Sequence, residues 1–185
     1  GNGATIYPNV ALQPERSDNF NLGLYGTIRM APGHVLYYEG SGFLRLVDDY
    51  IQATVSQQEG MMQYENVDAV HIKGVEGELR YDWSDKLHLM VNASYQDARD
   101  QRQYKQDGKP SVTYHNRTPN KPWSFINAEA SYTFKNLWLP SDRLRLSYEY
   151  QWVHWFYLTW EAYGSSKTKA RVPTQNLSNV GLLYS

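Results

Sequence analysis

The stretch Arg143-Leu144-Arg145-Leu146-Ser147-Tyr148-Glu149-Tyr150-Gln151-Trp152 decides the fold class. Apolar or aromatic side chains occupy every second position, and polar or charged side chains lie between them. This two-residue periodicity places the two sets on opposite faces of a β-strand. The apolar series continues to Trp160, so we predict one strand over about 144–160. Unbroken, it would span on the order of 60 Å, whereas strands in globular proteins average about 5–6 residues.

The same alternation recurs along the whole chain. Further strands are predicted at about 20–30, 42–56, 67–83, 86–100, 123–135 and 174–185. No stretch has the 3.6-residue periodicity of an amphipathic helix. The sequence therefore predicts an all-β fold, an antiparallel up-and-down meander of about seven long strands. A tilted membrane-spanning strand needs only about 9–11 residues, so these strands are long enough to cross a bilayer and project beyond it.

The predicted connections alternate between short and long. The turn at 83–86 is tight, and the connection 135–142 is short and carries Leu137, Trp138 and Leu139, whereas the segment 100–122 is long and charged. Short turns at one rim and long loops at the other are typical of a large transmembrane β-barrel with aromatic girdles. Periodicity alone leaves an alternative open, namely a soluble, secreted, β-rich carbohydrate-binding or adhesion module.

The composition excludes several other classes. The chain has 185 residues, enough for one domain, and its formal net charge of −1 gives no reason to expect a nucleic-acid partner. The absence of cysteine excludes thiol catalysis and cysteine zinc sites. No apolar run approaches the roughly 20 residues of a membrane helix. The mean hydropathy of −0.66 looks ordinary, but 15% of the residues are aromatic, which suits a barrel whose strands hide one apolar face.

Five groups of residues resemble the barrel signatures of TonB-dependent outer-membrane receptors. Residues 12–23 resemble "LxPExSxNxExG", departing at Asn21, where the family usually has Glu. The remaining four groups follow in the family's order: Phe43, Asp48 and Ile51; Asn66, Ala69, Ile72, Gly74, Val75 and Glu76; Arg117, Thr118, Pro119, Pro122, Asn127 and Tyr132; and Val172 to Asn176 with Gly181. Each group alone is weak, but their order and spacing across nearly the whole chain are specific.

The resemblance implies an orientation and an incomplete barrel. The strand from about Ser17 would run toward the periplasm, and the extracellular loops would be about 56–66, 100–122 and 161–173. Family barrels have roughly 22 strands. We therefore expect residues 1–185 to be a partial barrel from which the plug and the last strands are absent, with open edges through which the fragment could self-associate.

The sequence gives no support for enzymatic activity, and we expect no catalytic residues, metal site or cofactor. The five histidines lie far apart in sequence, without metal-ligand spacing. Glu76 and Glu78 share a strand face, which in a barrel is a solvated lumen. Asp97 and Asp100 are expected to be surface charges at the end of a strand.

The resemblance also implies a function and a location. We expect a barrel segment of a TonB-dependent transporter of the Gram-negative outer membrane, importing a ferric siderophore or a similar iron, haem or cobalamin complex. A glycan importer of the same family is the alternative. The implied partners are the TonB complex, outer-membrane lipid and the ligand. The ligand-binding candidates are aromatic and cationic residues of the loops: Tyr104, Tyr114, His115, Arg117, Trp155, Tyr157, Tyr163, Lys167 and Lys169.

Overall fold

The computed structural model describes residues 6–55, 62–104, 108–162 and 170–185. These residues form strands and no helices, so no helix among them is long and apolar enough to cross a membrane. The strands are β1 (Ile6–Tyr7), β2 (Arg16–Ala31), β3 (His34–Val55), β4 (Met62–Trp83), β5 (Leu87–Asp100), β6 (Ser124–Lys135), β7 (Arg143–Val153), β8 (Phe156–Tyr157), β9 (Arg171–Val172) and β10 (Gln175–Tyr184).

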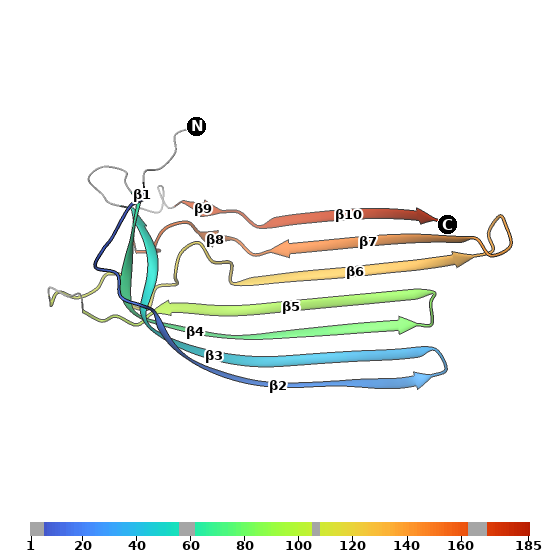
Figure 1. Ribbon diagram of the computed structural model, residues 1–185, viewed down its shortest axis with the longest axis horizontal. Helices are drawn as coiled ribbons and strands as arrows, with labels where there is room; N and C mark the ends of the chain where they lie inside the picture. The colour runs from blue at the N-terminus through green and yellow to red at the C-terminus, as the bar shows by residue number, and fades with distance from the viewer. Residues whose placement is uncertain (1–5, 56–61, 105–107, 163–169) are drawn as a thin grey trace.

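Seven long strands form one sheet in the order β10-β7-β6-β5-β4-β3-β2, with every neighbouring pair antiparallel (Figure 1). The predicted all-β meander is therefore confirmed. The three short turns, 32–33, 84–86 and 136–142, lie at one end of the sheet, and the longer connections lie at the other. We call these the turn end and the loop end.

β3 begins eight residues earlier than predicted. The stretch from Val35 to Tyr38 is apolar on both faces, so its sequence has no visible alternation, yet it pairs residue by residue with β4. Gly33, at φ 79°, makes the tight turn that joins β2 to β3, a left-handed conformation that glycine adopts without strain. Because of this turn, β2 and β3 form a hairpin with almost no loop.

The prediction of one continuous strand over 144–160 is wrong. β7 ends at Val153, and the separate strand β8 pairs only with β9. On both sides of β7 the neighbouring strands begin at this level, β6 after Pro122 and β10 after Pro173. The His154 N–H still donates to the Ser124 carbonyl at 2.9 Å. Beyond that bond neither neighbouring strand continues the pairing, and the prolines at these starts cannot donate a ladder hydrogen bond. Alternation alone does not reveal where partners end.

The two faces of the sheet differ sharply in polarity. On one face, the register aligns rows of apolar side chains across all seven strands, such as Ile28, Leu36, Tyr81, Leu89, Ala130, Tyr148 and Val180. On β5 this apolar face runs from residue 87 to residue 95. We call this part of the face, together with the residues that pair with it on the other six strands, the apolar belt. The opposite polar face carries Glu39, Glu76, Glu78, Arg80, Asn127, Glu129 and Glu149 at the same levels, with Arg145 one row beyond.

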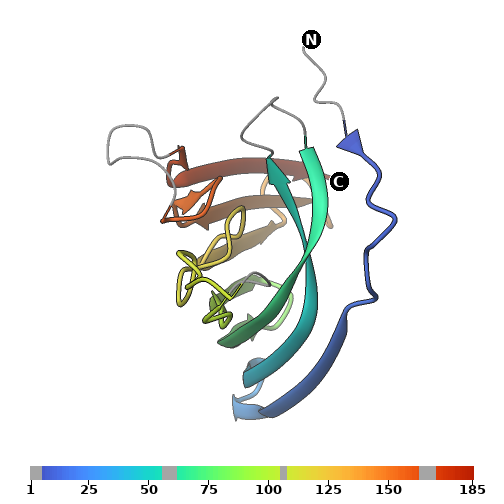
Figure 2. The ribbon, with the colours of Figure 1, turned by 90° about the vertical axis from the view of Figure 1, so that its left-hand side faces the viewer.

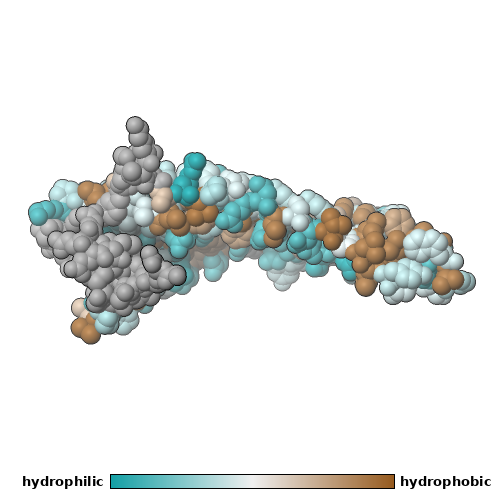
Figure 3. All heavy atoms as spheres, turned by 90° about the horizontal axis from the view of Figure 1, so that it is seen from above, coloured by the Kyte–Doolittle hydropathy of each residue, from teal (hydrophilic) through white to brown (hydrophobic). Residues whose placement is uncertain are grey.

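The belt is solvent-exposed. Leu22 is 83% exposed, Val75 58% and Val180 80%, and the few buried apolar residues lie elsewhere. Figure 3 shows apolar side chains gathered at the turn end, over the end of β10 and the β6–β7 turn, where Leu137, Leu139 and Leu182 are exposed. Nine residues at about 3.3 Å each make the belt on β5 roughly 26–30 Å long along the strand.

A small core lies at the loop end, on the polar face. β3 and β4 stay paired up to Val55 and Met62, beyond the end of β5, and curve across the loop end (Figures 1 and 2). Beneath them, the buried apolar side chains of the described residues form one cluster: Val47, Val70, Ile72, Ala98 and Trp160. The short strand β1, which the sequence did not predict, pairs in parallel with the start of β4.

Candidate functional site

The β5–β6 connection folds back along β5 at the loop end. Arg99 and Arg117 form an antiparallel bridge. On either side, the Thr118 N–H donates to the Ala98 carbonyl at 2.9 Å, and the Asp100 N–H donates to the Asn116 carbonyl at 3.0 Å. These bonds occupy the edge of β5 that β6 leaves open beyond Tyr95. The returning chain, residues 115–118, is therefore attached to the sheet.

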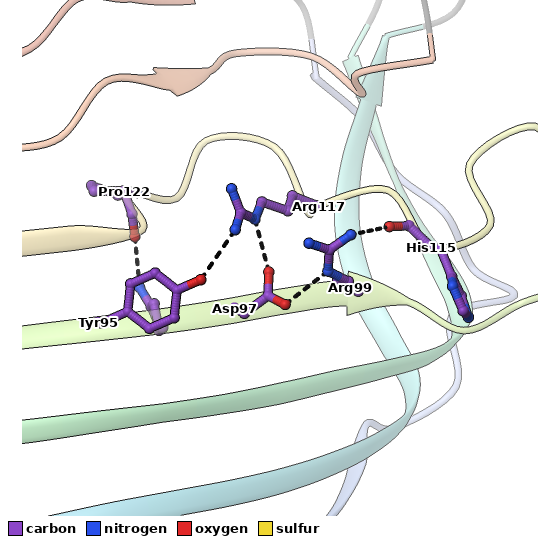
Figure 4. A network of polar contacts seen from close by, with 7 residues as sticks. Tyr95, Asp97, Arg99, His115, Arg117 and Pro122 are labelled. Atoms are coloured by element: carbon purple, nitrogen blue, oxygen red, sulfur yellow. Dashed lines mark hydrogen bonds and ion pairs between the residues drawn. The ribbon is translucent and has the colours of Figure 1, made fainter.

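Asp97 ties the returning chain to β5 (Figure 4). Its Oδ2 accepts a hydrogen bond from Arg99 Nε at 2.8 Å, and its Oδ1 accepts one from Arg117 Nε at 2.7 Å. Arg117 Nη2 also donates to the Tyr95 hydroxyl at 3.2 Å. Asp97 is 7% exposed, so the prediction of a surface charge is wrong. Two guanidinium groups, one of them 20 residues away in sequence, offset the free-energy cost of burying this carboxylate.

The ionised form of Asp97 is favoured. Burial raises the pKa of this carboxyl, but the hydrogen bonds and charges of Arg99 and Arg117 outweigh that effect, and the pKa lies below its usual value of 3.8. Asp97 therefore carries its charge at neutral pH.

Asp100 forms a second polar network, on the opposite face of β5. Its side chain is fully buried, and its Oδ2 accepts a hydrogen bond from the Thr113 hydroxyl at 2.5 Å. Its Oδ1 accepts one from the Arg102 N–H at 2.8 Å, and Ser111 extends the network to Thr113 at 2.9 Å. The prediction that Asp100 is a surface charge is also wrong, because the β5–β6 connection covers it.

An aromatic cluster adjoins the Asp97 network. The Arg117 guanidinium lies 3.7 Å from the centre of the Trp123 ring, a cation–π contact. The Trp123 ring contacts Trp155 at 4.4 Å and His154 at 5.2 Å between centroids. On its far side Trp155 contacts Tyr157 at 5.2 Å, and the Arg171 guanidinium lies over it at 5.2 Å.

The structure brings together only some of the predicted ligand residues. Arg117, Trp155 and Tyr157 share the aromatic cluster. The rings of Tyr114 and His115 are in contact, 4.0 Å apart between centroids and tilted by 41°. Tyr104, 56% exposed, forms an isolated β-bridge with Pro110. The other three candidates, Tyr163, Lys167 and Lys169, lie outside the described residues. Ligand contact by any of the nine stays a prediction.

Sequence reasoning missed Asp97, Arg99, Trp123, His154 and Arg171 as members of these networks. Trp123 directly follows Pro122, and Arg171 lies two residues before Pro173. These prolines stand at strand boundaries and mark the level where neighbouring strands start together. Glu76 and Glu78 line a hollow on the polar face with Glu39, and Glu76 accepts a hydrogen bond from Ser41 at 3.2 Å. Within the described residues no group of three or more His, Asp and Glu could hold a metal ion.

Comparisons with known proteins place this sheet in a family. Residues 1–184 match the family described as "TonB dependent receptor-like, beta-barrel". No curated protein matches the sequence. Among solved structures, the fold is similar to the FrpB iron transporter from Neisseria meningitidis (F3-3 variant), with a TM-score of 0.56 and 16% identity. The similarity covers 96% of this chain and 25% of that one. The chain belongs to the TonB-dependent receptor-like β-barrel family.

Proposed function

We propose that this chain is part of the wall of a TonB-dependent transporter in the Gram-negative outer membrane. The observation that carries the proposal is the apolar belt, which contains no Asp, Glu, Lys or Arg across seven paired strands and stays exposed to solvent. An exposed apolar surface of this extent needs a nonpolar environment. Its length of roughly 26–30 Å along the strand corresponds to a height of about 18–25 Å at the usual strand tilt of about 35–45°, close to the roughly 25 Å apolar band of outer-membrane barrels.

The aromatic residues at the ends of the belt support the same placement. Trp83, Tyr132, Phe134 and Tyr184 lie at the turn end, and Tyr95 and Trp152 lie at the loop end. Tyr and Trp are enriched at both membrane–water interfaces. In this orientation the polar face lines the lumen, and the loop end, with its aromatic cluster, faces the outside of the cell.

Within this proposal, the cargo is a scarce metal complex, most specifically an iron complex such as a ferric siderophore or haem, with the cobalt complex cobalamin as a further member of the class. The structural similarity to an iron transporter supports this choice of cargo. Energy comes from the TonB complex through the plug that family members carry. The wall binds and guides the cargo and has no enzymatic activity. The exposed rings of Tyr104 and Tyr114 favour a second candidate cargo, a glycan, because aromatic faces stack on sugars.

The test is growth of a strain lacking the gene on defined iron chelates, haem, cobalamin and glycans. The proposal predicts a growth defect on one iron-containing source or on cobalamin, restored by the wild-type gene and reproduced in a strain without TonB. A defect restricted to a glycan would favour the second cargo. Normal growth on every source, or recovery of the protein from soluble fractions in place of the outer membrane, would contradict the proposal.

A further inference from the structure

On the same side of the sheet as the belt, a group of charged side chains lies just beyond it toward the loop end. On β5 this face carries Tyr95, then Asp97 and Arg99, and the register places Lys73 of β4 beside Asp97. The bridge to Arg99 adds Arg117 from the returning chain. We call Lys73, Asp97, Arg99 and Arg117 the rim cluster. Three cations against one carboxylate leave it with a net charge of +2.

The cations of the rim cluster differ in availability. Arg117 is held by Asp97, Tyr95 and Trp123, and only 19% of its side chain is exposed. Arg99 donates from Nε to Asp97 and from Nη1 to the His115 carbonyl at 2.9 Å, and 39% of its side chain remains exposed. Lys73 is exposed. Asp97 and Arg117 are therefore held in place by their contacts, whereas the side chains of Arg99 and Lys73 beside them are accessible from outside the protein.

The position of the rim cluster determines what it meets. The proposed function places lipid chains against the belt, so side chains on the same face one or two rows beyond Tyr95 lie at the level of the headgroups. Cationic side chains at this level bind the phosphate groups of lipids. Each Lys or Arg near an anionic membrane surface adds substantially to the affinity of the protein for that surface. A cluster that served only the lumen would lie on the opposite face of β5.

We propose that the rim cluster binds a phosphate of a phosphorylated glycolipid headgroup in the leaflet around the loop end. This inference rests on the proposed function. A sugar phosphate fits better than a simple phospholipid because the rim cluster adjoins aromatic rings. Trp123 lies against Arg117, and Trp155 and Tyr157 follow it. Arg99 and Lys73 bind the phosphate, and the aromatic rings beside Arg117 contact the sugar to which it is attached.

The experiment measures lipid binding by native mass spectrometry of the protein in non-ionic detergent, after its insertion into lipid vesicles has been verified. The probes are lipid A bisphosphate, chemically dephosphorylated lipid A and phosphatidylglycerol. Loss of one cation should weaken lipid A binding by about fivefold, so Arg99→Gln should show that decrease and Lys73→Gln/Arg99→Gln about 25-fold. Arg99→Lys, which keeps the charge, should bind within about twofold of the wild type.

Arg80→Gln is the matched control. Arg80 has a similar side-chain exposure, 43%, but lies on the polar face, so its loss should leave binding unchanged. Equal binding of dephosphorylated lipid A, or no effect of Arg99→Gln and the double variant, would overturn the phosphate site. Equal affinity for phosphatidylglycerol would overturn the glycolipid assignment. Failure to insert into vesicles would instead contradict the proposed function, so the two failures are distinguishable.

Discussion

The side-chain amide of Asn66 bonds to both backbone polar groups of Gln13. Asn66 Oδ1 accepts a hydrogen bond from the Gln13 N–H at 2.8 Å, and Nδ2 donates to the Gln13 carbonyl at 2.9 Å. The same Nδ2 donates to the Asp49 carbonyl at 2.6 Å. The two residues are 53 positions apart in sequence and belong to two different signature groups. One amide therefore joins the segment before β2 to the hairpin of β3 and β4.

Replacing Asn66 with Ala should release this segment. Three hydrogen bonds are lost, and at about 0.5–1.5 kcal/mol each the free energy of local opening should fall by roughly 1.5–4.5 kcal/mol. Hydrogen exchange measures this directly. Faster exchange is expected at Gln13, and also at Ile51, whose N–H donates to Glu15 Oε2 at 3.3 Å in the same segment.

Asn19→Ala is the control for Asn66→Ala. Asn19 is exposed, and its amide donates only locally, to Ser17 Oγ at 3.3 Å. Its loss should leave exchange at Gln13 unchanged. If Asn66→Ala also left exchange at Gln13 unchanged, the amide would not hold the segment.

Replacing Asp97 with Asn should loosen the returning chain. Asn keeps the shape but loses the charge that two guanidinium groups share, and charge-assisted hydrogen bonds contribute about 1.5–3 kcal/mol each. Exchange at the Thr118 amide should rise by about 10- to 100-fold. Asp82→Asn provides a comparison, since Asp82 pairs with Arg80 and His88 on β4 and β5 away from this loop. Equal exchange at Thr118 in both variants would contradict the role of Asp97.

The strands themselves were largely predictable from the sequence. Alternation located β4, β5, β6 and β10 to within a few residues, because a strand with one apolar and one polar face has a two-residue period. Alternation failed to predict the strand ends that depend on where the neighbouring strands begin and end. β7 stops at Val153 because its partners begin there, and β3 extends back to His34 because β4 pairs with a stretch that has no alternation of its own.

The loop-end networks were not predictable in the same way. Asp97 and Asp100 look like surface charges in the sequence, since their partners Arg117 and Thr113 are 20 and 13 residues away. Only the return of the chain along β5 brings them together. Arg117, Trp155 and Tyr157, which the sequence offered as ligand candidates, do lie together at this end, and their contact with a ligand stays a prediction. Trp123, which connects them, carried no signal beyond its position beside Pro122.

Asp142 should make the β6–β7 turn dependent on pH. Its carboxylate accepts hydrogen bonds from the N–H groups of Leu137, Trp138 and Leu139 at 2.8–3.1 Å. Burial raises the pKa of Asp142, but these backbone donors outweigh it and hold the pKa below 3.8. A lowered pKa means that the folded state favours the carboxylate. The stabilisation is therefore fully present above pH 3.8 and is lost as the pH falls through the folded-state pKa.

Comparison of the wild type with Asp142→Asn tests this dependence. At pH 7 the variant should unfold at a lower urea concentration in detergent micelles than the wild type. As the pH falls below 3.8, the two midpoints should converge, because the wild-type carboxyl also becomes neutral. A difference that stayed constant down to low pH would show that the charge of Asp142 is unimportant for the turn.

The belt makes the sharpest prediction, because neighbouring positions on β5 face opposite environments. Val91 lies in the middle of the belt, in the row with Leu79 and Ala128. An arginine there would be in contact with lipid chains, at a cost of about 2–4 kcal/mol at the bilayer midplane. Val91→Arg should therefore lower the free energy of unfolding in phospholipid vesicles by about that amount.

Ser94→Arg is the matched comparison. Ser94 lies three residues further along the same strand, on the polar face, where the register places it beside Glu76. The new guanidinium would meet water and a carboxylate, so its effect on stability should stay within about 0.5 kcal/mol. Urea titration of both variants, in vesicles and in zwitterionic micelles, provides the measurement. If Val91→Arg were tolerated as well as Ser94→Arg, the apolar face would not contact lipid, and the faces of the sheet would have to be assigned differently.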